Sequence, residues 1–99
     1  MGAVWTLGTY RVKRGCEDEF VRVWRELARH AVAEFGASSP TFLRDREDTS
    51  VFVTFGVWDG LETLQRFRAS PPAVERGRVL GDLLEEGEAR ILEEVGVDD

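Results

Sequence analysis

The sequence contains very little cysteine and histidine, and these shortages exclude several classes of protein. Its one cysteine, Cys16, cannot form an intramolecular disulfide, and such cysteine usage is typical of a reducing compartment. One cysteine and one histidine, His30, leave only carboxylates to complete a metal site, and the acidic residues look like solvated faces rather than a ligand set. We therefore expect no metal ion.

Long hydrophobic runs are also absent. No stretch approaches the roughly 20 apolar residues that span a membrane, and the first residues lack the basic segment and the apolar core of a signal peptide. The net charge of -6 is carried by acidic residues spread along the chain, which argues against nucleic acid or an anionic membrane as the main partner. We expect a cytoplasmic protein without either partner.

What the sequence does contain is sufficient for one small domain. Its 99 residues are 42% hydrophobic and 32% charged, enough for one modest core and not for two. We therefore expect a single domain over residues 1–99.

The segment from Ser50 to Trp58 is the most informative part of the chain. Alternate residues of a strand point to opposite faces of the sheet. One face of this segment carries Val51, Val53, Phe55 and Val57, and the other carries Phe52, Gly56 and Trp58. Both faces are apolar, and a chain this short has few helices to cover them. The second face is therefore expected to be covered by another copy of the chain.

The elements before this strand follow from hydrophobic periodicity. A first strand is predicted over residues 3–12, and a helix over residues 17–35, because its apolar positions recur every three or four residues. Gly36 ends that helix. A short strand over residues 41–44 and a polar connection over residues 45–49 then lead into the central strand as a hairpin.

The elements after the strand are bounded by capping and breaking residues. Asp59 and Glu62 have the spacing of a capping box, which predicts that a second helix starts there. Pro71 and Pro72 end it and begin another helix, expected to continue to about Glu86. A last, partly polar strand is expected over residues 89–95, at a sheet edge or reaching into a partner.

This element order predicts an α+β fold of the ferredoxin-like, split βαβ type. Its antiparallel sheet carries helices on one face only. The other face must be hidden, and two such sheets packed face to face would hide it. We expect a homodimer formed through the open sheet face.

The central segment also resembles a known family. Phe55-Gly56-Val57-Trp58-Asp59, followed by Leu64, Phe67 and Ser70-Pro71, is similar to the antibiotic biosynthesis monooxygenase-like proteins of the dimeric α+β barrel superfamily. The resemblance covers nearly the whole chain by element order. That superfamily includes cofactor-free oxygenases of polycyclic phenols, haem-degrading enzymes, small isomerases and members without assigned chemistry.

The resemblance implies a set of site residues. Trp58 matches the tryptophan that packs on the substrate, and Arg78, or less well Arg76, matches an arginine that stabilises its anion. Phe55 and Phe67 of the same motif are expected to contact the substrate. No cofactor is implied for a cofactor-free oxygenase.

Two further residues could handle the proton of a phenol. His30 lies at the edge of the apolar stripe of the first helix, and Tyr10 lies on the first strand. Each has a structural alternative: His30 as a half-exposed helix residue and Tyr10 as a sheet residue. Trp58 could likewise be a core or interface aromatic, and Arg78 a surface residue.

The sequence also departs from the family pattern. Thr54 stands where the family often has asparagine, and Leu64 stands where a tyrosine can occur. The helix after Ser70-Pro71 carries no histidine over residues 74–78, so haem ligation is not expected.

Two functions therefore stay open. The first is a cofactor-independent monooxygenase that binds an aromatic or otherwise apolar metabolite in a cavity between sheet and helices. The alternative is a non-catalytic barrel, either a small-molecule-binding or a stress-related protein. A cavity lined by Trp58 and at least one of His30, Tyr10 or Arg78 would favour the first.

Overall fold

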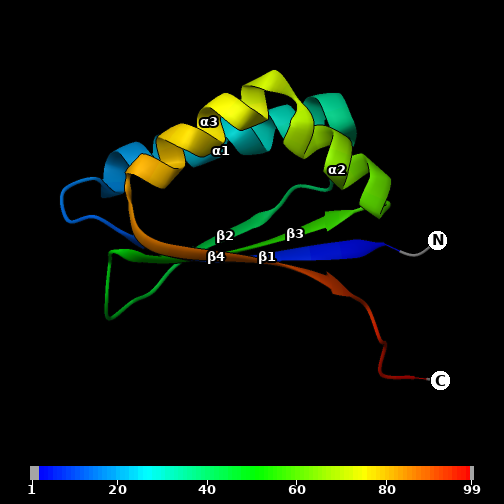
Figure 1. Ribbon diagram of the computed structural model, residues 1–99. Coiled ribbons are helices and arrows are strands. Elements are labelled where there is room, and N and C mark those ends of the chain that lie inside the picture. Colours follow the sequence, from blue (N-terminus) through cyan, green and yellow to red (C-terminus); the bar gives the residue numbers. More distant parts are fainter. Residues whose placement is uncertain (1–2, 99) are drawn as a thin grey trace.

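A computed structural model describes residues 3–98 as a four-stranded sheet covered on one face by helices (Figure 1). The elements in chain order are β1 (Val4–Val12), α1 (Glu17–Phe35), β2 (Thr41–Arg44), β3 (Val51–Trp58), α2 (Leu61–Ala69), α3 (Pro71–Asp82) and β4 (Leu84–Glu93). The strands lie in the order β2-β3-β1-β4, and every neighbouring pair is antiparallel. The predicted ferredoxin-like α+β fold is confirmed.

Acidic residues at the start of α1 and a glycine at its end explain where this helix begins and ends. Glu17, Asp18 and Glu19 place three carboxylates in the first turn, where they face the exposed amide groups. Gly36 adopts φ 67°, a left-handed conformation that glycine reaches without strain, and it ends the helix. Among residues 3–98, neither α1 nor any other helix has the length and apolar character needed to cross a membrane.

The predicted capping box at the start of α2 is wrong. The helix begins at Leu61, its N-cap residue is Gly60 in an extended conformation, and no side chain caps it. Asp59 therefore lies one residue too early for its carboxylate to take the N-cap position. Glu62 still contributes an acidic residue to the first turn.

The predicted boundary between the last helix and the last strand is also wrong. Helix α3 ends at Asp82, and β4 already begins at Leu84 rather than at residue 89. Pairing with β1 explains the difference, because Leu84 lies opposite Val12 and Gly87 lies opposite Tyr10. This ladder recruits residues whose local pattern fits a helix. As expected, β4 lies at an edge of the sheet.

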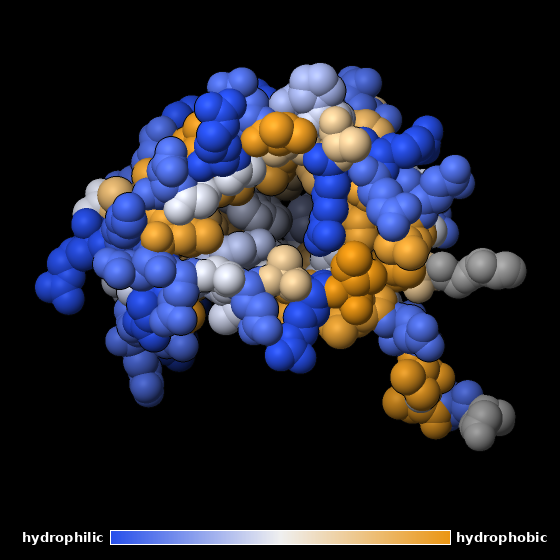
Figure 2. Space-filling model, in the orientation of Figure 1, coloured by the Kyte–Doolittle hydropathy of each residue, from blue (hydrophilic) through white to orange (hydrophobic). Residues whose placement is uncertain are grey.

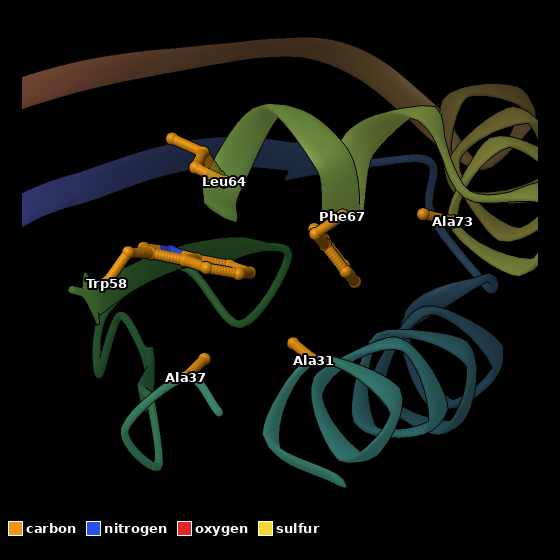
Figure 3. Close-up of a cluster of buried hydrophobic side chains, with 6 residues drawn as sticks. All are labelled: Ala31, Ala37, Trp58, Leu64, Phe67 and Ala73. Carbon is orange, nitrogen blue, oxygen red and sulfur yellow. The ribbon is translucent and has the colours of Figure 1, made fainter. Parts of the chain in front are cut away.

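The core consists of two clusters between the helices and the sheet. The Phe20 cluster contains the buried residues Val12, Phe20, Val23, Phe52 and Leu80. The Trp58 cluster contains Ala31, Ala37, Trp58, Leu64, Phe67 and Ala73 (Figure 3). Phe20 is fully buried, and its ring centroid lies 5.4 Å from that of Tyr10 and 5.2 Å from that of Phe52.

The opposite face of the sheet carries no helix (Figure 1). Strand alternation places Trp5 and Leu7 of β1 on that face, opposite Val57 and Phe55 of β3. Its apolar side chains are partly accessible, with Leu43 47%, Leu92 38% and Phe55 36% exposed. The face that the sequence predicts to be bare is therefore bare and apolar; we call it the open face.

Replacing Phe20 by alanine is expected to lower the free energy of unfolding by about 3–5 kcal/mol, because the fully buried ring leaves a cavity among other aromatic rings. Urea denaturation followed by circular dichroism measures this loss. Val32→Ala on the exposed side of α1 is the control and should change stability by less than about 0.5 kcal/mol. Equal losses in the two variants would contradict the assigned core.

Candidate functional site

A cavity of about 270 Å³ lies between the helices and the sheet. Figure 2 shows the molecule hollowed between the two layers, with hydrophilic residues beside the opening. Its floor is formed by strands and its ceiling by the three helices. The floor residues include Thr6, Gly8, Tyr10, Thr54, Gly56, Trp58 and Ala89, and the ceiling residues include Trp24, Leu27, Ala28, Ala31, Leu64, Phe67, Arg68, Ala73 and Gly77.

The cavity exists because small residues occupy its middle. Gly8, Gly56 and Ala89 lie on the floor, and the ceiling contributes alanines and Gly77. Large rings lie toward its two ends, where the Phe20 cluster and the Trp58 cluster fill the interior. Close packing at both ends and missing side chains between them leave an open space.

Glycine at positions 8 and 56 brings polar atoms onto the floor. A Cβ atom on Gly8 would overlap the Tyr10 hydroxyl and lie 2.7 Å from the Thr54 Oγ1. A Cβ atom on Gly56 would lie 2.8 Å from the Thr6 Oγ1 and 3.5 Å from the Trp58 Nε1. The side chains of Tyr10 and Trp58 thus extend over glycines, and each brings its polar atom beside a threonine hydroxyl.

These four polar atoms are available to a ligand. None of them takes part in a side-chain hydrogen bond within residues 3–98. In the same part of the chain, no fully buried side-chain nitrogen or oxygen lacks a partner. Because these four atoms have no partner, none of them is fully buried, and each contacts open space. This holds although Thr54 and Trp58 are each only 6% exposed.

Four of the predicted site residues line the cavity: Trp58, Tyr10, Phe67 and Phe55. Figure 3 shows the Trp58 indole extending toward Phe67, with Leu64 on one side and Ala37 on the other. The Trp58 and Phe67 ring centroids are 5.0 Å apart. Trp58 is thus both a core residue and a cavity residue, so the two roles considered for it are compatible.

The side chain of Phe55 points away from the helices. Strand alternation places its side chain on the open face, opposite Leu7, while Thr54 and Gly56 face the helices. Phe55 nevertheless borders the cavity, together with its neighbours Thr54 and Gly56. The motif residue that faces the cavity at this point is Gly56.

His30 and Arg78 lie outside the cavity lining. The His30 ring packs behind Phe67, with centroids 5.8 Å apart, and its Nε2 lies 3.3 Å from the Ser70 Oγ. The Ser70 hydroxyl donates its hydrogen to the Phe67 carbonyl at 2.7 Å, so His30 joins α1 to the α2–α3 junction. Arg78 is exposed on α3, and Arg76 pairs with Glu26 at 3.3 Å.

Arg68, Trp24 and Thr6 line the cavity, although they were not predicted as site residues. Arg68 supplies the charged group of the lining, and helical spacing could have found it because it lies four residues after Leu64. Trp24 lines the cavity and stacks on Phe42 with centroids 4.2 Å apart. Thr6 could have been found from its strand alternation with Tyr10.

The groups with shifted pKa values lie away from the cavity. Hydrogen bonds from Ser50, and then from Arg11, lower the pKa of Asp48 in the β2–β3 connection. A hydrogen bond from Arg22 lowers the pKa of Glu19. Both effects stabilise the fold at neutral pH and are lost as the pH falls through these lowered values. Within residues 3–98 no three histidine, cysteine or acidic residues are grouped to hold a metal ion.

The sequence profile of the antibiotic biosynthesis monooxygenase family matches residues 4–75. The chain belongs to this family. The match spans β1 to the first half of α3 and so includes nearly all of the cavity lining. A comparison with curated protein sequences found no significant match.

Solved structures of similar proteins share the fold of this family member. SnoaB, a cofactor-independent oxygenase from Streptomyces nogalater, has a TM-score of 0.88 at 22% identity, over 98% of this chain and 97% of SnoaB. A conserved protein from Methanosarcina mazei Go1 has a TM-score of 0.86 at 20% identity, over 95% and 94% of the two chains. A protein of unknown function from Bacteroides thetaiotaomicron has a TM-score of 0.85 at 15% identity, over 94% of this chain and 98% of that protein.

Replacing Gly8 by alanine is expected to displace the Tyr10 side chain from the cavity floor, because the new methyl group would occupy the position of the hydroxyl. Such overpacking should lower the free energy of unfolding by about 1–3 kcal/mol. Thermal or urea denaturation measures the loss, and the tyrosine absorbance spectrum reports the changed surroundings of the ring.

Gly81→Ala is the matched control for this substitution. Nothing lies within 4 Å of a Cβ at this helical position, so alanine should leave stability unchanged or raise it by up to about 1 kcal/mol. A Gly8→Ala variant as stable as the unmodified protein would contradict the described floor.

Proposed function

We propose that this chain is a cofactor-independent monooxygenase that oxidises an aromatic or phenolic molecule bound in the cavity. The observation that carries the proposal is the site itself: an apolar cavity whose floor presents the buried Trp58 indole and unpaired hydroxyl groups. Membership of the family and the shared fold with SnoaB, which is described as a cofactor-independent oxygenase, support it.

A phenol can itself supply all four electrons that dioxygen needs. One oxygen atom enters at a ring carbon that carries hydrogen, giving a quinone, and the other oxygen atom leaves as water with two hydrogens from the phenol. No separate reductant is required for this balance. The protein must then bind the phenol, stabilise its anion and exclude bulk water.

The geometry suggests which residues perform these tasks. Trp58 and Phe67 pack on the ring, and the Tyr10 hydroxyl relays the phenol proton, accepting it while it passes its own hydrogen to water at the cavity opening. We assign stabilisation of the anion to the floor hydroxyls and the Trp58 N–H, with Arg68 as the nearest cation of the lining. Arg78 and His30 would have to reach the cavity to serve in these roles, and their positions favour Tyr10 and Arg68 instead.

We further propose that the protein is a homodimer through the open face. Trp5, Leu7, Val53, Phe55 and Val57 form a continuous apolar area over β1 and β3. At about 25 cal/mol per Å² of apolar surface removed from water, covering several hundred Å² would stabilise so small a domain strongly. Charged residues of β4, including Glu88 and Arg90, flank this area rather than interrupt it.

The alternative is a non-catalytic barrel that binds a small molecule. The neutral floor favours this alternative, because the lining holds no carboxylate or histidine that could act as a strong base. Thr54 and Leu64 in place of asparagine and tyrosine favour it as well. Oxygen consumption separates the two functions, whereas ligand binding does not.

Trp58→Phe is expected to abolish oxygen uptake with phenolic substrates while the dimer persists, because the smaller ring keeps the core but loses the indole N–H and its stacking area. An oxygen electrode measures uptake. Trp5→Phe on the open face is the matched control and should retain uptake. If no phenol supports uptake by the unmodified protein, the monooxygenase proposal fails and the binding function is retained.

Val53→Arg is expected to convert the dimer to a monomer, because it places a charge in the centre of the open face. Native mass spectrometry at micromolar concentration reports the subunit number. Val32→Arg on the exposed side of α1 introduces the same charge away from that face and should leave the dimer intact. An unmodified protein that is monomeric under these conditions would overturn the proposed assembly.

A further inference from the structure

The polar atoms of the cavity floor form two separate pairs. The indole pair consists of the Thr6 Oγ1 and the Trp58 Nε1, both within 3.5 Å of a Cβ placed on Gly56. The tyrosine pair consists of the Tyr10 hydroxyl and the Thr54 Oγ1, which share the space where a Cβ on Gly8 would stand. Each pair therefore gathers around one glycine.

The sheet register sets the spacing of the two glycines around which the pairs gather. Gly8 lies opposite Thr54, and Gly56 lies opposite Thr6, so the two glycines are diagonal neighbours on the same face of β1 and β3. Diagonal neighbours on an antiparallel pair are about 7–8 Å apart. Because the pairs lie beside different glycines, we expect one small polar group to contact one pair at a time.

The chemistry of the pairs is that of hydrogen-bond donors to oxygen. The indole N–H only donates, whereas the tyrosine and threonine hydroxyls donate or accept. No charged residue lies on the floor, and Thr54 and Trp58 are each 6% exposed. A bound molecule that lacks an oxygen atom at one of the pairs would leave the polar atoms of that pair without hydrogen-bond partners. Such a loss weakens binding.

The space between the pairs suits a flat apolar body. The missing side chains at Gly8 and Gly56 leave the sheet surface open, and Ala28, Ala31, Ala73 and Gly77 face it from the helices. The volume of about 270 Å³ lies just below the range of about 300–1,000 Å³ that is usual for small-molecule pockets. These limits favour a small fused aromatic ring system.

We propose that the cavity selects aromatic molecules that carry two oxygen substituents about 7–8 Å apart, one bound by each pair. Tyr10 and Thr54 are then the specificity-determining residues, and Trp58 and Thr6 bind the other oxygen. This selection rests on the proposed binding of an aromatic molecule in the cavity, and it deepens that function by naming the substitution pattern.

Isothermal titration calorimetry with three matched probes tests the selection. 2,6-Dihydroxynaphthalene carries hydroxyls at opposite ends, 2,3-dihydroxynaphthalene carries them on adjacent carbons, and 2-naphthol carries one. Only the first can engage both pairs, so it should bind about five- to tenfold more tightly than the other two, the effect of one added hydrogen bond.

Single substitutions then assign the preference to the tyrosine pair. Tyr10→Phe and Thr54→Val remove a hydroxyl and keep the shape of the side chain, and each should reduce the preference for the 2,6-isomer to less than about twofold. Affinity for 2-naphthol should stay within about twofold, because the indole pair remains. Thr9→Val removes an exposed hydroxyl of β1 on the open face and should preserve the preference.

The possible results separate this inference from the proposed function. Equal affinities of the unmodified protein for all three probes would overturn the two-point selection and leave aromatic binding intact. A preference that survives both Tyr10→Phe and Thr54→Val would also overturn it. Failure of all three probes to bind would overturn the aromatic-binding function and the selection together.

Discussion

The structure depends on the pairing of β1 with both of its neighbours. This strand lies between β3 and β4, and its alternate residues form the cavity floor on one face and the open face on the other. A shift of the register by one residue would exchange Thr6 and Gly8 for Trp5 and Leu7. The site and the surface that we assign to the dimer are therefore set by the same hydrogen-bonded ladders.

The cavity results from an unusual arrangement of large and small residues. The Phe20 and Trp58 clusters pack closely at its two ends and hold the sheet and helices apart. Between them, glycines and alanines leave a space that the neighbouring rings do not fill. Desolvation by these apolar walls strengthens any hydrogen bond formed to the floor, and this makes neutral hydroxyls effective in a site without charged floor residues.

Much of the fold could be predicted from the sequence because the relevant signals are local. The helical stripe and Gly36 define α1, and strand alternation identified the two apolar faces of β3. The start of β4 could not be predicted, because Leu84 and Gly87 join a strand only through their pairing with β1. The capping box failed for a similar reason, since the chain leaving β3 places Gly60 at the N-cap.

The candidate site was predictable only in part. By itself the sequence determined the central strand, its tryptophan and the need to cover two apolar faces, because periodicity and residue type suffice for these features. Only the tertiary structure decided that the helices cover the face of β3 opposite Phe55, that His30 and Arg78 lie outside the cavity, and that Arg68 lines it. It also decided that Tyr10 and Trp58 extend over Gly8 and Gly56 toward the threonines. Such contacts join residues that are distant along the chain, and their positions follow from packing, which no local pattern encodes.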